Sequence, residues 1–275
     1  GQDRAYFDRK RSGEERHMCG IVGAVGHNRC GSVLLDALKR LEYRGYDSSG
    51  IVTLHDGQIN LRRAVGKLVH LEDALAALPL QGNIGIGHTR WATHGVPNDI
   101  NAHPHTSKSK SIALIHNGII ENSTILKKHL LSKGHNFKSQ TDTEVIVHLI
   151  TEHLKSSELE DAITKTLKQL HGSFALGIVF KDIPDLIVGA RRGSPLAVGY
   201  GPNENYLGSD SYALKSMTNK ISYLDDGEFC IVKKDQVLFF NEDGKKVNKK
   251  ILELSSNEAN YDKGDFKHFM AKEIE

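Results

Sequence analysis

Seven short, apolar, strand-like runs follow one another in the second half of the chain, and they constrain its fold more than any other feature. They cover residues 174–181, 186–190, 196–200, 206–208, 221–224, 228–232 and 237–240. Segments with helical periodicity are gathered elsewhere, mostly between residues 123 and 170. Because strands and helices form separate groups instead of alternating, the pattern predicts an α+β fold with layers of mostly antiparallel sheet.

The remaining elements are expected from the same kinds of pattern. Further strands are expected at residues 19–26, 51–54, 58–64, 83–89 and 111–116, and Asp56-Gly57 is a favoured hairpin turn between two of them. Helical spacing of apolar side chains indicates helices at residues 33–41, 69–78, 123–133, 142–155 and 159–170. The fourth of these helices opens with Thr141-Asp142-Thr143-Glu144, which has the spacing of a capping box.

The composition excludes several classes of protein. The 36 basic and 34 acidic residues leave a net charge of +2, so neither a nucleic acid nor a membrane surface is an expected partner. No run approaches the roughly 18 apolar residues that span a bilayer. The three cysteines (Cys19, Cys30 and Cys230) are far apart and odd in number, which is not the pattern of a disulfide framework. We therefore expect a reducing compartment, the cytoplasm.

Composition also suggests how the chain is divided. Residues 1–17 contain nine charged residues and no apolar periodicity. They lack the apolar centre of a signal peptide, and we expect an added leader or a misassigned upstream extension. Residues 18–254 are expected to form one domain. Residues 255–275 are polar and are expected to be a linker.

A cysteine at the start of the first expected strand, in the stretch MCGIVGAVG, raises a chemical question. A thiol has a pKa of about 8.5, so a nucleophilic cysteine needs a base or a lowered pKa. If Cys19 were the first residue, its own α-amine, with a pKa of about 7.7 to 8.0, could be that base. An acylated nitrogen could not, so the mechanism fails if anything precedes Cys19. The alternative is that Cys19 is a small buried hydrophobic residue.

Four further stretches carry polar groups in what look like loops beside buried strands: LEYRGYDSSG, GHTRWATHG, HNGIIEN and TDTE. Together they offer what hydrolysis of a free amino acid's side-chain amide requires. Arg90 could bind the substrate carboxylate and Asp142 its ammonium group. Asn117 and Gly118 could donate two hydrogen bonds to the developing oxyanion. Singly, each has a simpler interpretation: a surface ion pair, a helix first-turn charge, and a type I′ turn.

Six motifs, in order, resemble a known family: MCGIVGAVG, LEYRGYDSSG, HTRWATHG, NAHPH, HNGIIEN and TDTEV. The chain resembles the glutaminase domain of the glutamine–fructose-6-phosphate aminotransferases (isomerising), also called glucosamine-6-phosphate synthases. These are class II glutamine amidotransferases among the N-terminal-nucleophile hydrolases. The match runs from Met18 to about residue 240, and KHFMAKEIE resembles the segment that leads into the family's isomerase half. The implied fold is a four-layer α/β/β/α sandwich of two antiparallel sheets.

The resemblance also implies roles for individual residues. Cys19 would be the nucleophile that takes the glutamine acyl group as a thioester, and Asn117 and Gly118 would form the oxyanion hole. The other implied residues contact or enclose glutamine: Arg90 and Asp142 as clamps, Thr93 and His94 in the pocket, Arg44 and Tyr46 in a closing loop, and Trp91 as a gate on the ammonia route. No cofactor and no metal is expected.

The implied activity is release of glutamate and ammonia from glutamine. In the family's full-length enzymes, the ammonia converts fructose 6-phosphate to glucosamine 6-phosphate for amino-sugar synthesis. That step uses the isomerase half, which this chain lacks, and the resemblance implies a homo-oligomeric parent enzyme. The alternative is a catalytically blocked, glutamine-binding fragment, because residues precede Cys19.

Other classes of site have weaker support. Fifteen histidines, with His103 and His105 close to His88 and His94 in sequence, suggest a metal protein, but no pair has a familiar zinc spacing. The chain has no Gly-x-Ser-x-Gly motif and no glycine-rich dinucleotide or phosphate motif. The roles of His103 and His105 stay open.

Overall fold

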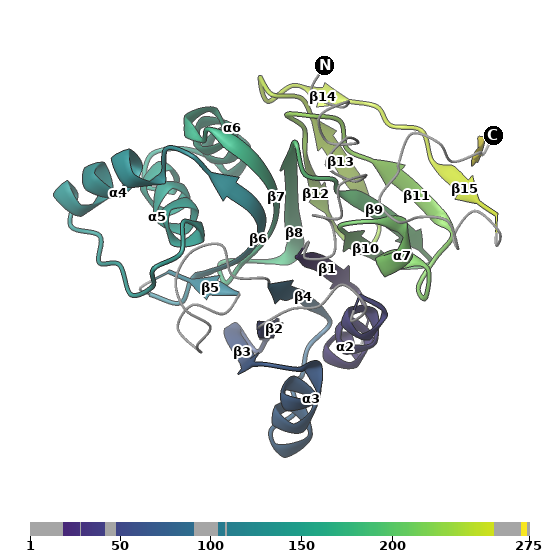
Figure 1. Cartoon of the computed structure of the whole chain (residues 1–275). Helices are drawn as coiled ribbons and strands as arrows, with labels where there is room; N and C mark the ends of the chain where they lie inside the picture. Colours follow the sequence, from purple (N-terminus) through teal and green to yellow (C-terminus); the bar gives the residue numbers. More distant parts are fainter. Residues whose placement is uncertain are drawn as a thin grey trace, which may run out of the picture.

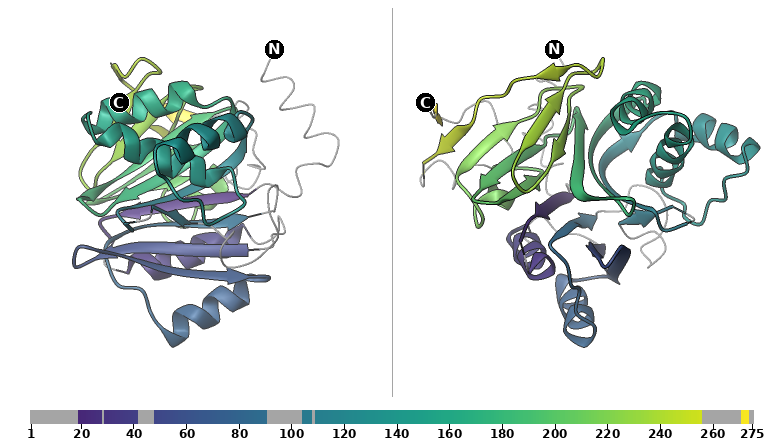
Figure 2. Two further views of the ribbon diagram at one scale, coloured as in Figure 1. Left: turned by 90° about the vertical axis from the view of Figure 1, so that its left-hand side faces the viewer. Right: turned by 180° about the vertical axis from the view of Figure 1, so that it is seen from behind.

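A computed structural model describes residues 19–27, 29–41, 48–90, 104–107 and 109–255, together with the backbone of 271–273. Two antiparallel sheets face each other, and helices cover the outer side of each (Figures 1 and 2). The predicted four-layer α/β/β/α sandwich is confirmed.

The first sheet has nine strands in the described residues, and β1 lies in its middle. Their spatial order is β16-β15-β11-β9-β10-β1-β4-β2-β3, with antiparallel pairing throughout. The bounds are β1 Gly20–Val25, β2 Ser48–His55, β3 Gln58–Val65, β4 Ile84–Arg90, β9 Ala197–Gly201, β10 Glu204–Gly208, β11 Lys220–Tyr223, β15 Leu252–Leu254 and β16 Ala271–Glu273.

The second sheet has seven strands in the described residues, in the order β14-β13-β12-β8-β7-β6-β5. Their bounds are β5 His105–Thr106, β6 Ile112–Ile120, β7 Gly172–Phe180, β8 Ile183–Arg192, β12 Phe229–Val232, β13 Val237–Phe240 and β14 Lys246–Val247. The helices are α2 Cys30–Arg40, α3 Leu68–Ala77, α4 Ser123–Ser132, α5 Thr143–Leu154, α6 Leu159–Gln169 and α7 Ser211–Leu214. None of these helices is long and apolar enough to cross a membrane.

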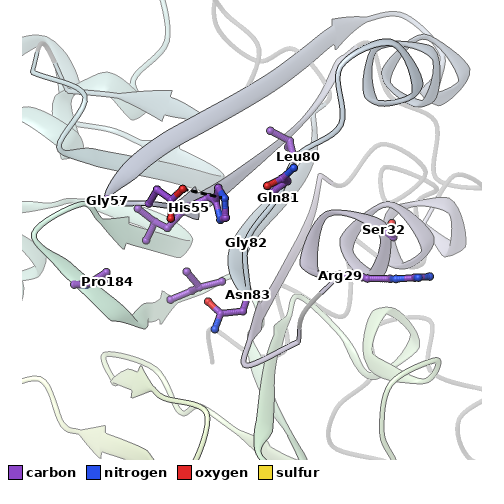
Figure 3. A pocket seen from close by; sticks show the side chains of 12 residues that line it. Arg29, Ser32, His55, Gly57, Leu80, Gln81, Gly82, Asn83 and Pro184 are labelled. Atoms are coloured by element: carbon purple, nitrogen blue, oxygen red, sulfur yellow. Dashed lines mark ion pairs between the residues drawn. The ribbon is translucent and has the colours of Figure 1, made fainter.

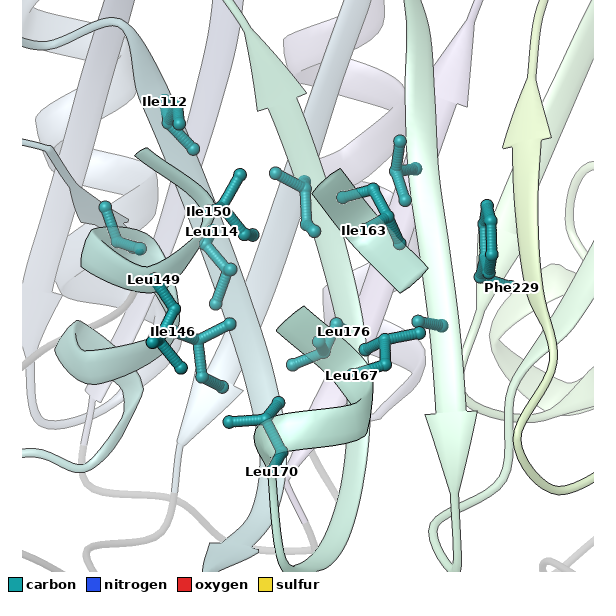
Figure 4. Close-up of a cluster of buried hydrophobic side chains, with 14 of the residues drawn as sticks. Ile112, Leu114, Ile146, Leu149, Ile150, Ile163, Leu167, Leu170, Leu176 and Phe229 are labelled. Carbon is teal, nitrogen blue, oxygen red and sulfur yellow. The ribbon is translucent and has the colours of Figure 1, made fainter. Parts of the chain in front are cut away.

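Three apolar clusters hold the layers together. Side chains of a strand alternate between its two faces, so each sheet can pack against helices on one face and against the other sheet on the other. One cluster joins α5 and α6 to the seven-stranded sheet; Ile146, Leu149 and Ile163 belong to it (Figure 4). A second fills the space between the sheets, and a third joins α2 and α3 to the nine-stranded sheet. The space between the sheets is therefore filled by apolar side chains along most of its length.

The structure differs from the sequence-based expectations at two places that matter for the site. β6 continues to Ile120, so Asn117 and Gly118 pair with Ala175 and Phe174 of β7 and do not form a turn. Pairing with a long neighbouring strand outweighs the low strand propensity of Asn and Gly.

The expected capping box is also wrong. The cap residue of α5 is Asp142, and no side chain makes a capping hydrogen bond there. Glu144 binds the segment before the helix instead. The expectations also missed several short elements, among them α7 and β15.

Candidate functional site

Three strands bring the expected site residues to one end of the sandwich. β1 and β4 pair with Gly20 opposite Thr89, which brings Cys19 to the level of Arg90. The Thr89 hydroxyl accepts a hydrogen bond from the Gly20 N–H at 3.1 Å and fixes this register. β6 of the other sheet faces them with Asn117. Residues about a hundred positions apart therefore meet because the two sheets are stacked.

Strand alternation explains why these side chains point between the sheets. In β4, Ile84 and Ile86 belong to the apolar cluster between the sheets, so His88 and Arg90 continue the same face. In β6, Ala113 and Ile115 belong to that cluster, and Asn117 follows them. The core between the sheets thus changes from apolar to polar at this end.

Asn117 links the two sheets through both ends of its amide. Its Nδ2 donates a hydrogen bond to the carbonyl oxygen of Cys19 at 2.8 Å. Its Oδ1 lies 3.0 Å from Nε2 of His88. Asn117 is 4% exposed and His88 is fully buried. Because buried polar groups are costly to leave unpaired, these bonds hold the amide in one orientation.

His88 is neutral in this setting. Burial lowers its pKa to about 3, against the opposing effect of the hydrogen bond with Asn117; the charges of His116 and Arg90 lower it further. A neutral imidazole has one N–H. Since an amide oxygen can only accept, Nε2 of His88 is the donor toward Asn117.

Gly118 occupies a backbone conformation that favours glycine. Its φ angle is +109°, and a Cβ atom would lie 2.2 Å from the carbonyl oxygen of Ser173. Both facts exclude an unstrained side chain at this position. The residue after Asn117 therefore presents only its backbone.

Asp142 lies beside the same strand. One carboxylate oxygen, Oδ2, accepts a hydrogen bond from the N–H of Ile120 at 2.7 Å. The other, Oδ1, is 3.9 Å from Nδ1 of His116, which also lies 3.0 Å from the Thr143 hydroxyl. Asp142 is 6% exposed, so it is a buried carboxylate and not an exposed first-turn charge.

Glu144 holds the segment that leads to Asp142. Its carboxylate accepts hydrogen bonds from the N–H groups of Lys138 and Ser139, at 2.8 and 2.7 Å, and from the Ser139 hydroxyl at 2.6 Å. Burial would raise the pKa of Glu144, but hydrogen bonds from His148, Ser139 and Lys138 outweigh it and lower the pKa to about 2. This carboxylate is therefore ionised in the folded protein.

His105 supports the same segment from the other side. Its Nε2 lies 2.7 Å from the Thr141 hydroxyl, which is 3.0 Å from the Ser139 hydroxyl. Burial lowers the pKa of His105 to about 3; the Glu144 charge opposes this, and nearby cations add to it. A neutral, buried His105 thus packs and hydrogen-bonds next to Asp142.

Only some of the expected site residues lie in the part of the chain that the structure describes. Cys19, which is partly exposed and forms no disulfide, lies with Asn117, Gly118, Arg90 and Asp142 around the ends of β1, β4 and β6. Arg90 is only 3% exposed, which excludes a surface ion pair. The other expected residues lie outside the described residues: Arg44, Tyr46, Trp91, Thr93, His94 and His103.

Sequence reasoning gave no role in the site to two residues that the structure connects to it, His88 and Glu144. His88 could have been found by continuing the inward-facing positions Ile84 and Ile86 by two more residues. Glu144 offered no such signal, because its partners precede the helix. In the described residues, no group of three or more His, Cys, Asp or Glu side chains could hold a metal ion.

A surface hollow of about 730 Å³ lies at the opposite end of β4 (Figure 3). Its lining includes Arg29, His55, Gly57 and Asn83, and no expected site residue belongs to it. His55 pairs there with Asp56 at 3.3 Å. This hollow and the buried polar contacts are therefore at different ends of the same strand.

Known proteins resemble this chain strongly. Residues 88–216 match the family model described as "Glutamine amidotransferase domain". A glutamine–fructose-6-phosphate aminotransferase [isomerizing] from Mesorhizobium japonicum is 54% identical over 258 residues, and one from Thermococcus kodakarensis is 50% identical over 259 residues. Each alignment covers 94% of this chain, which spans only 42% and 43% of those relatives.

A solved structure of a glutamine amidotransferase has a similar fold. The glutamine phosphoribosylpyrophosphate amidotransferase from B. subtilis, in complex with ADP and GMP, superposes with a TM-score of 0.69 at 28% identity. That match covers 84% of this chain and 50% of the other.

Proposed function

Because this chain carries a class II glutamine amidotransferase domain, we propose that it hydrolyses the side-chain amide of glutamine to glutamate and ammonia, with Cys19 as nucleophile. The observation that carries this proposal is the hydrogen bond from Asn117 Nδ2 to the Cys19 carbonyl oxygen at 2.8 Å. It means that a side-chain N–H donor and a cysteine at the start of a strand occupy one small volume.

The chemistry proceeds in two steps. The Cys19 thiol gives its proton to a catalytic base as its sulfur attacks the amide carbon of glutamine, and the negative charge that develops on the amide oxygen is stabilised by the Asn117 Nδ2–H and the Gly118 N–H. The C–N bond then breaks, and ammonia leaves with a proton delivered by the catalytic base. Water attacks the resulting thioester, which releases glutamate and restores the thiol.

The clamps on the substrate are proposed from charge and position. Arg90 would pair with the glutamine α-carboxylate and Asp142 with the α-ammonium group. Asp142 is suited to this because the Ile120 N–H fixes one of its oxygens at the strand that carries Asn117. Thr93 and His94 are proposed to complete the pocket, and Arg44 and Tyr46 to lie in a loop that closes over it. Trp91 is proposed to be a gate on the ammonia route.

The base is proposed to be the α-amine of Cys19, which requires a chain that begins at Cys19. An α-amine with a pKa near 8 is partly neutral at pH 7, whereas an amide nitrogen has no basic lone pair. Residues that precede Cys19 would therefore leave a domain that binds glutamine but does not hydrolyse it.

The experiment is glutamate release by the sequence as given and by a version that begins at Cys19, with both N-termini verified by intact mass. We expect turnover only from the version that begins at Cys19. Cys19→Ala in that version should bind glutamine by calorimetry without releasing glutamate. Equal turnover by both versions would overturn the α-amine mechanism, and no turnover and no binding by either would overturn the proposed function.

The relatives' names extend the proposal to a longer protein. In it, the ammonia would convert fructose 6-phosphate to glucosamine 6-phosphate at an isomerase half beyond this chain, within a homo-oligomer. We place it in the cytoplasm; the three cysteines being free thiols supports a reducing compartment. Production of glucosamine 6-phosphate from glutamine by this chain alone would contradict the assignment of the two reactions to separate halves.

A further inference from the structure

We propose that His88 is a positioning residue for the oxyanion site, whose Nε2–H holds the Asn117 amide with its N–H side toward Cys19. This inference rests on the proposed function. Three residues carry it: His88 on β4, Asn117 on β6 and Cys19 immediately before β1, joined by bonds of 3.0 and 2.8 Å.

The two ends of an asparagine amide differ only in which end donates, so the neighbours decide its orientation. If the Asn117 amide were turned by 180°, its oxygen would face the carbonyl oxygen of Cys19, and two acceptors would meet. Its NH₂ group would then face Nε2 of His88, which could accept only if the ring proton moved to Nδ1. One orientation therefore satisfies both neighbours.

The His88 ring can perform this task because its protonation does not change near neutral pH. It is fully buried, and its pKa is about 3 as a result of that burial. The groups that face it are Asn117 and the cationic or titratable side chains of His116 and Arg90, and both of the latter disfavour an imidazolium. His88 thus remains a neutral donor over the whole range in which the thiol and amine titrate.

The position of His88 on β4 also distinguishes a positioning role from ordinary packing. The preceding inward-facing residues of β4 are Ile84 and Ile86, which contact the apolar cluster between the sheets. A fully buried imidazole at the next inward position loses hydration, and its bond to Asn117 offsets that loss. The same bond joins the two sheets, and Asn117 carries it on to Cys19.

The test uses the whole chain beginning at Cys19 and two substitutions of similar length. His88→Gln keeps an N–H donor near the position of Nε2, and His88→Met removes it. We expect His88→Met to lower kcat for glutamine about tenfold to a hundredfold, less than full loss of an oxyanion donor, with KM within about twofold. His88→Gln should retain at least about a third of kcat. Equal Tm values for the two variants would exclude a folding defect.

A double-mutant cycle with Asn117→Ala decides whether His88 acts through Asn117. If it does, His88→Met should lower kcat no further once Asn117 is alanine. A merely structural His88 predicts that the two losses multiply, and that result would overturn the proposal, as would a kcat unchanged in His88→Met.

A second readout does not depend on turnover. The side-chain NH₂ resonances of Asn117 should be a single sharp pair in the wild type and in His88→Gln, and broadened or doubled in His88→Met. An undisturbed pair in His88→Met would overturn the positioning role. If the wild-type chain released no glutamate, the proposed function would fail, and these resonances would still show whether His88 orients the amide.

Discussion

The two ends of strand β4 hold their polar side chains in opposite ways. At its C-terminal end, His88 and Arg90 are almost fully buried and lie close to Asn117 of the other sheet. At its N-terminal end, about 17 Å away along the strand, polar side chains line an open hollow. The hollow is open to solvent, whereas the buried end holds fixed donors and carboxylates of the kind that the proposed amide chemistry requires. The two ends therefore differ in how firmly their polar groups are held.

Of the substitutions at the two ends, the one that removes the Cys19 sulfur should have the largest effect on glutamate release. Cys19→Ala, in a chain that begins at this position, should reduce glutamate release by more than about a thousandfold, because no other group there can form the thioester. His55→Ala in the hollow should leave the rate unchanged. Loss of activity in His55→Ala with normal folding would mean that the hollow takes part in the reaction.

The second-largest effect is expected on the free energy of unfolding and its pH dependence, when Glu144 is substituted. Its pKa is lowered to about 2 in the folded protein, so it contributes stability above its unfolded pKa of about 4.5, and this contribution is lost as pH falls toward 2. Glu144→Gln should therefore cost on the order of 3 kcal/mol at pH 7 and about half of that or less at pH 3.

Urea unfolding at both pH values measures this. The control is Glu72→Gln, which breaks an exposed pair with Lys39 and should cost less than about 1 kcal/mol at either pH. A Glu144→Gln deficit that is the same at pH 3 and pH 7 would contradict the assigned ionisation.

Two glycines with positive φ allow a matched comparison of backbone strain. Gly118→Ala, at φ +109° and with a carbonyl oxygen 2.2 Å from the new Cβ, should cost about 1–3 kcal/mol and reduce turnover. Gly57→Ala, at φ +69° in the hairpin at the hollow, meets nothing within 4 Å and should cost about 1 kcal/mol without affecting turnover. If both substitutions lowered the free energy of unfolding by similar amounts, the crowding at Gly118 would be relieved by a small shift of the backbone.

The smallest expected effect separates charge from hydrogen bonding at Asp142. Asp142→Asn keeps an oxygen that can accept from the Ile120 N–H but removes the negative charge, so KM for glutamine should rise about tenfold with kcat nearly unchanged. Asp56→Asn, an exposed carboxylate of the hollow, should change neither constant. An unchanged KM in Asp142→Asn would remove Asp142 from the proposed ammonium clamp.

The sequence by itself determined the layers of the fold and most of the residues in the proposed site. Grouped strands and helices fixed the class of fold, because each run must bury one face. The motif around Cys19 and the stretches with Asn117, Gly118, Arg90 and Asp142 carried enough chemistry to suggest amide hydrolysis.

Only the tertiary structure decided how those residues are held. The sequence placed Asn117-Gly118 in a loop or turn, but the pairing of β6 with β7 makes it part of a strand, and Gly118 has a positive φ within that strand. The sequence suggested that Glu144 caps a helix, but its carboxylate binds the two N–H groups of Lys138 and Ser139. The bond between His88 and Asn117 joins two sheets, and no local pattern specifies which faces of two separate sheets will meet. Local periodicity sets where a side chain points, whereas its partner depends on packing between segments far apart in the chain.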